Sequence, residues 1–420
     1  MSDAGTNRTD RGPNPVEGIV PHVTSTLYGG AAIAAHRICA AQRSAGIEAQ
    51  LFFRESEGSP DPQTSVPHHA IPTTRRRIMA SKSLSAVNRV LKRRQSVLFT
   101  PFAYSLSVSE LRRLLPSSRI LALHNLYNVT TLRMLRRAFP DAHLAVTLHD
   151  ERTLTSGCHY TQGCERYISG CSSCPQCRLP LPIRRFGDDL HQMLLSDANV
   201  SFVAPSRWLR GQAIQAGLDP VRVAHIANPI DPQIFGLRSS TPLSRTDVLT
   251  VGWLPGKGES QFWEAMSQVR ALLAPARLRV RTTTHTLKAE GVEIDNFPKL
   301  ATELDRACFW SGADIGVCLT RADNFPNVVL EALSVGTPFI INGEGGAGEA
   351  IRDTGGGEIL ERAHPSELAQ ALVRAVSSPE TWQRRGAEAA RRVREIYSPQ
   401  VIGAQYEQHY RSALRVTGQT

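Results

Sequence analysis

The sequence predicts an α/β protein of two lobes, each with a parallel sheet covered by helices. The chain has 420 residues, more than one hydrophobic core usually holds, since domains comprise about 100 to 200 residues. From residue 17 onward, short apolar runs alternate with amphipathic stretches, as in chains of βαβ units. This alternation lapses once, in a stretch rich in Pro, Ser and Gly near residues 228–245, which indicates a linker between the lobes.

Apolar runs of strand length define the elements of both sheets. In the first lobe they are Gly18–Val23, Gln50–Phe53, Ile120–His124, His143–His149 and Val200–Ala204. In the second lobe they are Val248–Gly252, Leu278–Thr283, Ile315–Leu319 and Pro338–Ile341. The last helical pattern starts at Ser398 and Pro399, which match an N-cap with proline at the first helical position. We expect this terminal helix to pack back on the first lobe.

These patterns divide the chain into parts with different expected structures. A polar leader lacks the apolar core of a secretory signal. No run of roughly 18 apolar residues occurs, so we expect no transmembrane helix and a cytoplasmic protein. Ligands of open α/β sheets bind at the carboxyl ends of strands, which predicts a site in a cleft between facing lobes. The parts are a disordered leader at residues 1–16, a first lobe at 17–230, a linker at 231–245, a second lobe at 246–397 and a terminal helix at 398–420.

The net charge of +10 favours an anionic partner: nucleoside diphosphates, acidic lipids or nucleic acid. Eight basic residues and no acid lie in Thr73–Gln95. Within it, Leu84, Val87 and Leu91 have helical spacing. Residues 75–94 therefore predict either a helix on an anionic membrane surface or the solvated face of an ordinary helix. Nucleic acid is disfavoured, because no aromatic residue is interleaved to stack on bases.

In the second lobe, two acids surround the start of a predicted helix. Asp323 and Glu331 are separated by seven residues, which places one carboxylate before the helix and the other about one turn inside it. Backbone amides at a helix start can hold phosphate or sugar oxygens. A carboxylate such as Glu331 can accept hydrogen bonds from a ribose. The candidate donor-binding residues between the acids are Asn324, Phe325, Pro326 and Asn327.

This stretch resembles the retaining GT-B glycosyltransferases of family four. The resemblance rests on the two acids with their seven-residue gap and on the letters EAL, GTP and GG that follow, ending at Glu349. One departure is Asp323, which stands where the family has Glu and still supplies a carboxylate. The landmarks PS-x-W from Pro205 and N-x-ID from Asn228 extend the resemblance over nearly the whole chain. It implies two Rossmann-like lobes facing each other across a cleft.

The resemblance also assigns a role to the turn that opens the second lobe. The family motif G-x4-KG spans Gly252–Gly258 and makes Lys257 the cation that neutralises the donor diphosphate. Negative charge grows on this leaving group, so a fixed cation would stabilise the transition state. Many members have an arginine after the first glycine, whereas this chain has Trp253. The alternative is that Lys257 is an exposed residue at a helix start.

The first lobe adds two glycines and two histidines. Gly29 and Gly30 follow the first strand, where the family turns its backbone toward the donor phosphate, although tight turns need glycine anyway. His124 and His149 end two apolar strands at the predicted cleft. A family histidine at the His149 position contacts the transferred sugar, which implies a catalytic role for His149 and a sugar or acceptor contact for His124 and Asp150. The alternative for either histidine is a hydrogen-bonded core position.

Five of the eight cysteines lie in one predicted insertion at residues 157–178. Disulfides are rare in the cytoplasm, and clustered thiols are typical ligands of tetrahedral zinc. The spacing predicts a structural zinc site that braces the acceptor-side loop, and the alternative is a set of reduced structural thiols. A similar insertion occurs in the family branch with the DN-x-PN variant, which resembles bacterial polysaccharide enzymes. The predicted ligands are Cys158, Cys164, Cys171 and Cys174, with Cys177 as an alternate.

Together these residues predict a retaining glycosyltransferase that uses a UDP- or GDP-sugar without a catalytic metal. The resemblance implies a front-face mechanism with His149, Lys257 and Asp323, in which the departing diphosphate accepts the proton of the acceptor hydroxyl. The expected acceptor is lipid-linked or a polysaccharide at the inner membrane face. Two alternatives stay open: a sugar-nucleotide epimerase or phosphorylase on the same scaffold, and an inactive metal-braced scaffold protein.

Overall fold

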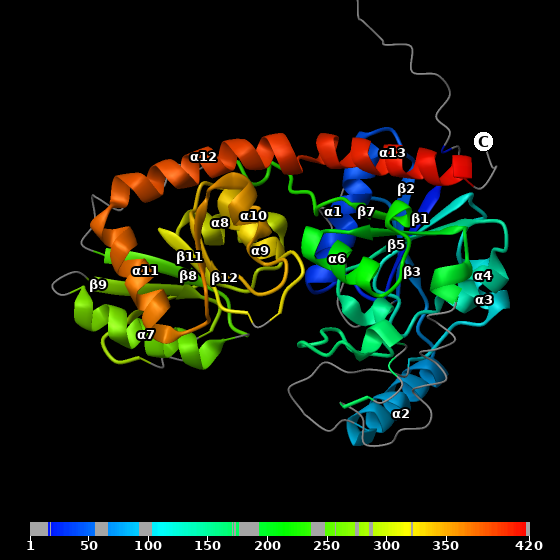
Figure 1. Cartoon of the computed structure of the whole chain (residues 1–420), viewed down its shortest axis with the longest axis horizontal. Helices are drawn as coiled ribbons and strands as arrows, with labels where there is room; N and C mark the ends of the chain where they lie inside the picture. The colour runs from blue at the N-terminus through cyan, green and yellow to red at the C-terminus, as the bar shows by residue number, and fades with distance from the viewer. Residues whose placement is uncertain are drawn as a thin grey trace, which may run out of the picture.

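Two parallel sheets lie side by side in two lobes (Figure 1). The α/β class and the two-lobed architecture predicted from the sequence are confirmed. The leader, most of the linker, Lys257 and Cys177 lie outside the described residues. The computed structural model describes residues 16, 18–54, 66–91, 103–169, 171, 174–175, 193–236, 248–256, 258–273, 277–284, 289–320 and 322–416.

The first lobe contains a seven-stranded sheet in the order β3-β2-β1-β4-β5-β6-β7. Its central strands are buried along their length, as parallel strands covered by helices must be. The strands are β1 (Val20–Thr24), β2 (Ala49–Arg54), β3 (His68–Ile71), β4 (Ile120–Leu123), β5 (His143–Thr147), β6 (Val200–Ala204) and β7 (Val223–His225). The helices are α1 (Gly30–Ser44), α2 (Arg75–Leu91), α3 (Val108–Leu114), α4 (Leu132–Ala138) and α6 (Arg207–Gln215), with 3-10 turns at Glu151–Leu154, Arg166–Ser169 and Pro220–Arg222.

The second lobe contains a six-stranded parallel sheet in the order β10-β9-β8-β11-β12-β13. Its strands are β8 (Val248–Trp253), β9 (Arg277–Thr282), β10 (Glu293–Asn296), β11 (Ile315–Cys318), β12 (Phe339–Asn342) and β13 (Gly357–Leu360). Its helices are α7 (Glu259–Leu272), α8 (Glu303–Ser311), α9 (Asn327–Ser334), α10 (Glu349–Thr354) and α11 (Pro365–Ser377).

The nine strands predicted from apolar runs are the inner strands of the two sheets. The four that the sequence missed, β3, β7, β10 and β13, are the edge strands. Each has only three or four residues, and β3 and β10 carry exposed or half-buried polar side chains. An edge strand has a neighbour on one side only and need not present an apolar run. Apolar runs therefore identify the strands that are buried between two neighbouring strands of a sheet.

The C-terminal helices α12 (Pro379–Tyr397) and α13 (Pro399–Val416) run along both lobes in Figure 1. Between them the chain turns at Ser398. Helix α13 packs on α1, which confirms the predicted return to the first lobe. Tyr406 and Tyr410 of α13 are buried in the core that α1 shares with the second lobe.

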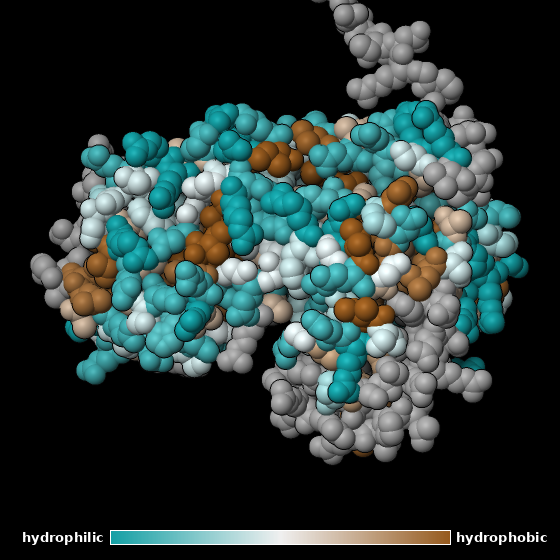
Figure 2. Space-filling view, viewed as in Figure 1, coloured by the Kyte–Doolittle hydropathy of each residue, from teal (hydrophilic) through white to brown (hydrophobic). Residues whose placement is uncertain are grey.

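Helix α2 stands apart from the sheet at the lower end of the first lobe (Figure 1). The stripe predicted on it is divided: Leu91 is buried and Leu84 half-buried, whereas Val87 is exposed. Three other apolar side chains on this helix, Ile78, Met79 and Val90, are also exposed. Elsewhere, Figure 2 shows hydrophobic side chains in small separate patches on a mostly hydrophilic face. Among the described helices, none is long and apolar enough to cross a bilayer.

Candidate active site

Asp323 lies in the loop between β11 and α9, as predicted. The Gly346 amide donates to the Asp323 carbonyl at 3.0 Å, which holds two loops of the second lobe together. A Cβ added at Gly346 would lie 1.9 Å from the Asn324 carbonyl oxygen. Glycine is therefore required here because the chain's own backbone approaches so closely.

The charge of the Asp323 carboxylate acts on a residue of the first lobe, Tyr160. Burial, followed by the nearby carboxylates of Asp323 and Asp150, raises the pKa of Tyr160. His159 places Nδ1 2.6 Å from Asp150 Oδ2. The Glu151 carboxylate accepts from the Thr161 amide at 2.7 Å and fastens the same segment. The Cys-rich insertion thus joins His159 to Asp150 and places Tyr160 where the charges of both Asp323 and Asp150 act on it.

His159 and Tyr160 were not among the predicted site residues. The sequence contained one signal for them, because they follow Cys158 directly inside the insertion predicted to brace the acceptor side. Their contacts cross from the insertion to two separate loops. Residue spacing alone does not reveal such contacts.

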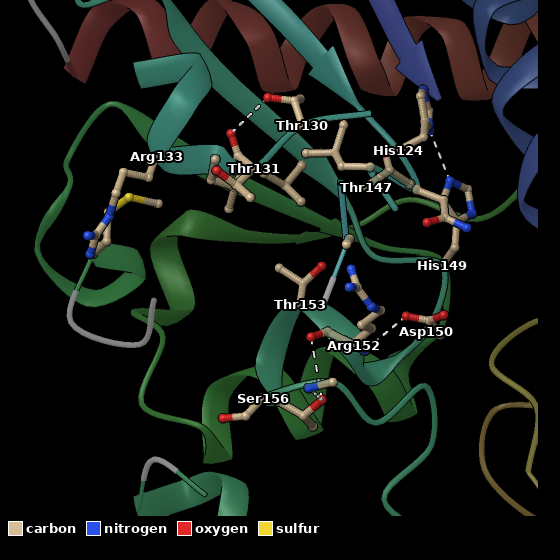
Figure 3. A pocket seen from close by; sticks show the side chains of 18 of the residues that line it. His124, Thr130, Thr131, Arg133, Thr147, His149, Asp150, Arg152, Thr153 and Ser156 are labelled. Carbon is tan, nitrogen blue, oxygen red and sulfur yellow. Dashed lines mark hydrogen bonds between the residues drawn. The ribbon is translucent and has the colours of Figure 1, made fainter. Parts of the chain in front are cut away.

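A cavity of about 400 Å³ opens beside these residues, at the carboxyl ends of β4 and β5 (Figure 3). His124, His149 and Asp150 all line it, so the structure brings together the three predicted first-lobe contacts. Burial lowers the pKa of His149 to about 4 against the opposing charge of Asp150, which leaves the imidazole neutral at pH 7. The other lining side chains include Leu84, Leu126, Thr131, Leu132, Arg133, Val146, Arg152, Ser156 and Met193.

The predicted donor-binding helix start is hydrogen-bonded to the first lobe. Asn324 Nδ2 donates to the Leu148 carbonyl at 3.0 Å, and Ser206 Oγ donates to Asn324 Oδ1 at 2.5 Å. Asn327 Nδ2 donates to the Gly30 carbonyl at 2.9 Å. In this structure, the side chains of Asn324 and Asn327 therefore join the lobes.

Glu349, the last residue of the pattern, also acts across the lobes. Its two carboxylate oxygens accept from the backbone amides of Arg207 and Trp208 at 2.8 Å each. These are the first amides of α6, which have no partner within their own helix. A carboxylate is favourable at a helix N-terminus because the helix dipole is positive there.

Glu331 is buried in an ion-pair cluster between the lobes. Its Oε1 lies 2.7 Å from Arg37 Nη2 of α1, and its Oε2 accepts from Trp310 Nε1 at 3.3 Å. Arg37 also pairs with Glu303 of α8 at 2.6 Å. Because Glu331 is only 1% exposed, the ribose contact predicted for it would require one of these partners to be replaced. That role stays a prediction.

Near the predicted diphosphate site, glycine is needed at two turns for different structural reasons. Gly29 precedes α1 with φ 86°, a conformation that favours glycine. Gly258 precedes α7 with φ 70°, and a Cβ there would lie 2.6 Å from the Leu319 carbonyl oxygen. Trp253 is buried and stacks on Phe262 with ring centroids 4.5 Å apart. The family's arginine position is thus taken by a core residue.

The four predicted zinc ligands, Cys158, Cys164, Cys171 and Cys174, line one small cavity. The Cys158 and Cys174 thiols are within hydrogen-bonding distance, and this contact and burial raise the pKa of Cys158. Within the described ranges, no three or more His, Cys, Asp or Glu side chains form a group that could hold a metal ion. The structure therefore gathers the thiols without a preformed metal geometry.

Comparison with known proteins finds glycosyltransferases by both family model and sequence search. The family model for glycosyl transferases group 1 matches residues 245–378, most of the second lobe. WcaC of Escherichia coli strain K12, a candidate colanic acid biosynthesis glycosyl transferase, is 28% identical over 298 residues, which cover 65% of this chain and 69% of that protein. YtcC of Bacillus subtilis strain 168, a candidate glycosyltransferase, is 22% identical over 284 residues, covering 63% of this chain and 65% of YtcC.

Solved structures agree on the fold. Anabaena Alr3699/HepE, in complex with UDP and glucose, has a TM-score of 0.61 at 15% identity and covers 94% of this chain and 99% of its own. Sucrose-phosphate synthase from Thermosynechococcus elongatus has a TM-score of 0.61 at 14% identity with the same coverage. Two facing Rossmann-like lobes and an acid-bearing helix start define a glycosyltransferase with the GT-B fold. In its second lobe the chain is similar to the group 1 glycosyl transferases, whose family model matches residues 245–378.

Proposed function

We propose that this protein transfers a sugar from a nucleoside diphosphate sugar to an acceptor hydroxyl held in the first-lobe cavity. One observation carries the proposal: Asp323 of the second lobe lies close enough to Tyr160 of the first lobe to raise the pKa of its hydroxyl, and Asp150, which acts on the same hydroxyl, lines the cavity together with His149. This is the place where donor and acceptor would have to meet. UDP is the favoured nucleotide, because the similar Anabaena structure holds UDP and glucose.

The proposed roles follow the site geometry and the family resemblance. Asp323 and His149 hold the transferred sugar. Lys257 neutralises the diphosphate, whose charge grows as it leaves and which accepts the acceptor proton in a front-face step. Gly29, Gly30 and the amides at the start of α9 complete the donor site.

The proposed acceptor is lipid-linked and approaches from an anionic membrane surface on the cytoplasmic side. Two features support this. The exposed face of α2 carries Met79 and Val90, each 69% exposed, among basic residues, as in helices that lie in a lipid interface. Leu84 of the same helix lines the cavity. A helix held on lipid would therefore place the cavity next to a membrane-bound acceptor.

The function is tested by following radiolabel from UDP-, GDP- and ADP-sugars into vesicle lipid. We expect one donor to raise the unfolding temperature, since it binds only the folded state, and its label to enter the lipid extract of vesicles made with bacterial lipid-linked acceptors. Asp323→Asn should lower transfer by about 100-fold, because a group that contacts the reacting sugar is changed. Vesicles with anionic lipid should support more transfer than neutral ones.

The same experiment separates the alternatives. An epimerase would convert the donor without any acceptor, and an inactive scaffold would give neither conversion nor transfer. Donor binding with label released only into water would overturn the lipid acceptor. As a control, Arg391→Ala on the exposed face of α12, away from the described site, should transfer as the wild type does.

We also propose that zinc, when bound, uses the four clustered thiols and fastens the loop that carries His159 and Tyr160. The support is the donor set, because four cysteines around one small cavity suit tetrahedral zinc. Elemental analysis of protein purified under reducing conditions should find about one zinc per chain. Cys158→Ser should remove it and lower the unfolding temperature, whereas Cys308→Ser in the second lobe should not. Metal-free, fully stable protein would contradict the proposal.

A further inference from the structure

Three histidines cross the first-lobe sheet in a row that ends at the active site. His22 Nδ1 lies 2.9 Å from His124 Nε2, and His124 Nδ1 lies 2.9 Å from His149 Nε2. The ring centroids are 5.2 Å apart at both steps. Figure 3 shows the last step, from His124 to His149 at the cavity. His22 is 0% exposed and takes no part in the proposed reaction.

The strand register explains why the three rings meet. In the pairing of β1 with β4, His22 is opposite Ala122, and His124 lies two residues further on. Ala122 is in turn opposite Ala145 of β5. His149 is four residues beyond Ala145. Since side chains alternate between faces, all three histidines lie on one face, each two residues closer to the carboxyl edge than the last.

Helices α1 and α13 continue the row away from the site. Gln42 of α1 places Oε1 3.0 Å from His22 Nε2, and its Nε2 donates to the Tyr410 hydroxyl at 2.9 Å. Gln42 and Tyr410 are both buried. An unbroken chain of hydrogen bonds therefore links Tyr410 of the C-terminal helix to His149, through Gln42, His22 and His124.

Each hydrogen bond in this chain determines the direction of the next. With the Gln42 amide nitrogen donating to Tyr410, its oxygen faces His22 and accepts from His22 Nε2–H. A neutral imidazole has one donor and one acceptor, so His22 Nδ1 accepts from His124 Nε2–H. By the same rule, His124 Nδ1 accepts from His149 Nε2–H. The remaining nitrogen of His149, Nδ1, then carries no proton.

The surroundings keep the rings neutral. Burial lowers the pKa of His22 to about 4, and burial together with the two neighbouring histidines lowers the pKa of His124 well below its ordinary value. Titratable groups near the row include Cys39 of α1, Tyr406 and Tyr410 of α13, and Asp150 and Arg152, which line the cavity with His149. Burial raises the pKa values of Cys39, Tyr406 and Tyr410, so they too are uncharged at pH 7. Asp150 is the one carboxylate that acts on the described row, at its active-site end.

We propose that Gln42, His22 and His124 are positioning residues that set the tautomer of His149, so that its Nδ1 accepts a hydrogen bond from a substrate hydroxyl. Tyr410 orients Gln42 and thereby gives the C-terminal helix a part in the active site. The inference rests on the proposed function for the identity of the substrate, but the tautomer itself is a property of the protein without ligand. Its test is therefore independent of turnover.

The test is ¹⁵N NMR of histidine-labelled full-length protein at pH 7.5. In the wild type, His149 should show a protonated Nε2 and a bare Nδ1. Gln42→Leu and Tyr410→Phe should convert this into a mixture of tautomers, although Tyr410 is on another helix. His143→Gln is the matched control, because His143 bonds Ser201 at 2.7 Å and Ser201 bonds His409 of α13 at 3.0 Å, outside the row. It should leave the His149 spectrum unchanged.

Kinetics and titration complete the test. His22→Phe and His149→Ala should each lower kcat/KM by about tenfold, the value of one hydrogen bond to the substrate, and the double variant should be no worse than His149→Ala. A perturbed His149 Nδ1 resonance with UDP-glucose would assign the hydroxyl to the donor, and one with free glucose would assign it to the acceptor side. A protonated Nδ1 in the wild type, unchanged tautomers in Gln42→Leu, additive losses, or no response to either ligand would overturn the proposal. Absence of transfer with the predicted tautomer intact would instead contradict only the proposed function.

Discussion

Replacing Arg37 with alanine should lower the free energy of unfolding by about 3–5 kcal/mol, because two buried carboxylates lose their cation. Arg37 Nη2 lies 2.6 Å from Glu303 and 2.7 Å from Glu331, and Arg37 and Glu331 are almost completely buried. Arg306, 3.1 Å from Glu303 and 3.7 Å from Glu331, remains and offsets part of the loss. Urea denaturation followed by circular dichroism measures the change.

A double-mutant cycle separates the ion pair from the rest of the side chain. If Arg37 and Glu331 stabilise each other, the double change Arg37→Ala with Glu331→Ala should cost about 0.5–3 kcal/mol less than the sum of the single changes, as is usual for neighbours in contact. Arg391→Ala is the control, because Arg391 pairs with Glu388 and Glu395 on the surface of α12. It should leave the transition unchanged. Strictly additive effects of Arg37 and Glu331 would show that the pair contributes nothing.

Acidification from pH 7 to pH 5 should lower the stability of the protein by several kcal/mol. Burial is the main reason why the pKa values of His22, His149 and His409 are lowered to about 4 and that of His143 to about 3. The unfolded chain takes up protons at these histidines below about pH 6.5, whereas the folded chain does not until about pH 4. Their stabilisation is therefore complete above pH 6.5 and lost as the pH falls toward 4, at up to about 1.4 kcal/mol per histidine per pH unit.

Two described carboxyl groups act in the opposite direction. Burial raises the pKa of Asp314 to about 6 and also raises the pKa of Glu151, so their protonation in the folded state relieves a cost as the pH falls. Four histidines outweigh these two carboxyl groups in the same window. Guanidinium denaturation at pH 7.5, 6.5, 5.5 and 5.0 measures the slope, and His143→Gln should reduce it by the share of one histidine. Equal stability at pH 7 and pH 5 would contradict the burial of these groups.

Much of the fold can be predicted from the sequence, because buried strands appear in it as runs of apolar residues. Every inner strand of both sheets appears as an apolar run, and the Ser398–Pro399 helix start was recognised from local capping chemistry. The edge strands have no such apolar runs. The two acids around α9 and the Cys-rich insertion were likewise visible, because spacing along one segment is a local property.

Only the tertiary structure decided what these side chains touch. Asn324 and Glu331 bond to the first lobe, because packing of α9 against α1 and the end of β5 brings distant backbone and Arg37 within reach. Nothing in the sequence connects His22, in the middle of a buried strand, with His149, which is 127 residues further along the chain. The strand order β1-β4-β5 brings them close, because only β4 lies between their two strands. The sequence by itself determined the class, the lobes and the candidate acids. How the lobes join and how His149 is held depend on hydrogen bonds between segments that are far apart in the chain. Such bonds leave no periodic pattern in the sequence, so only the tertiary structure shows them.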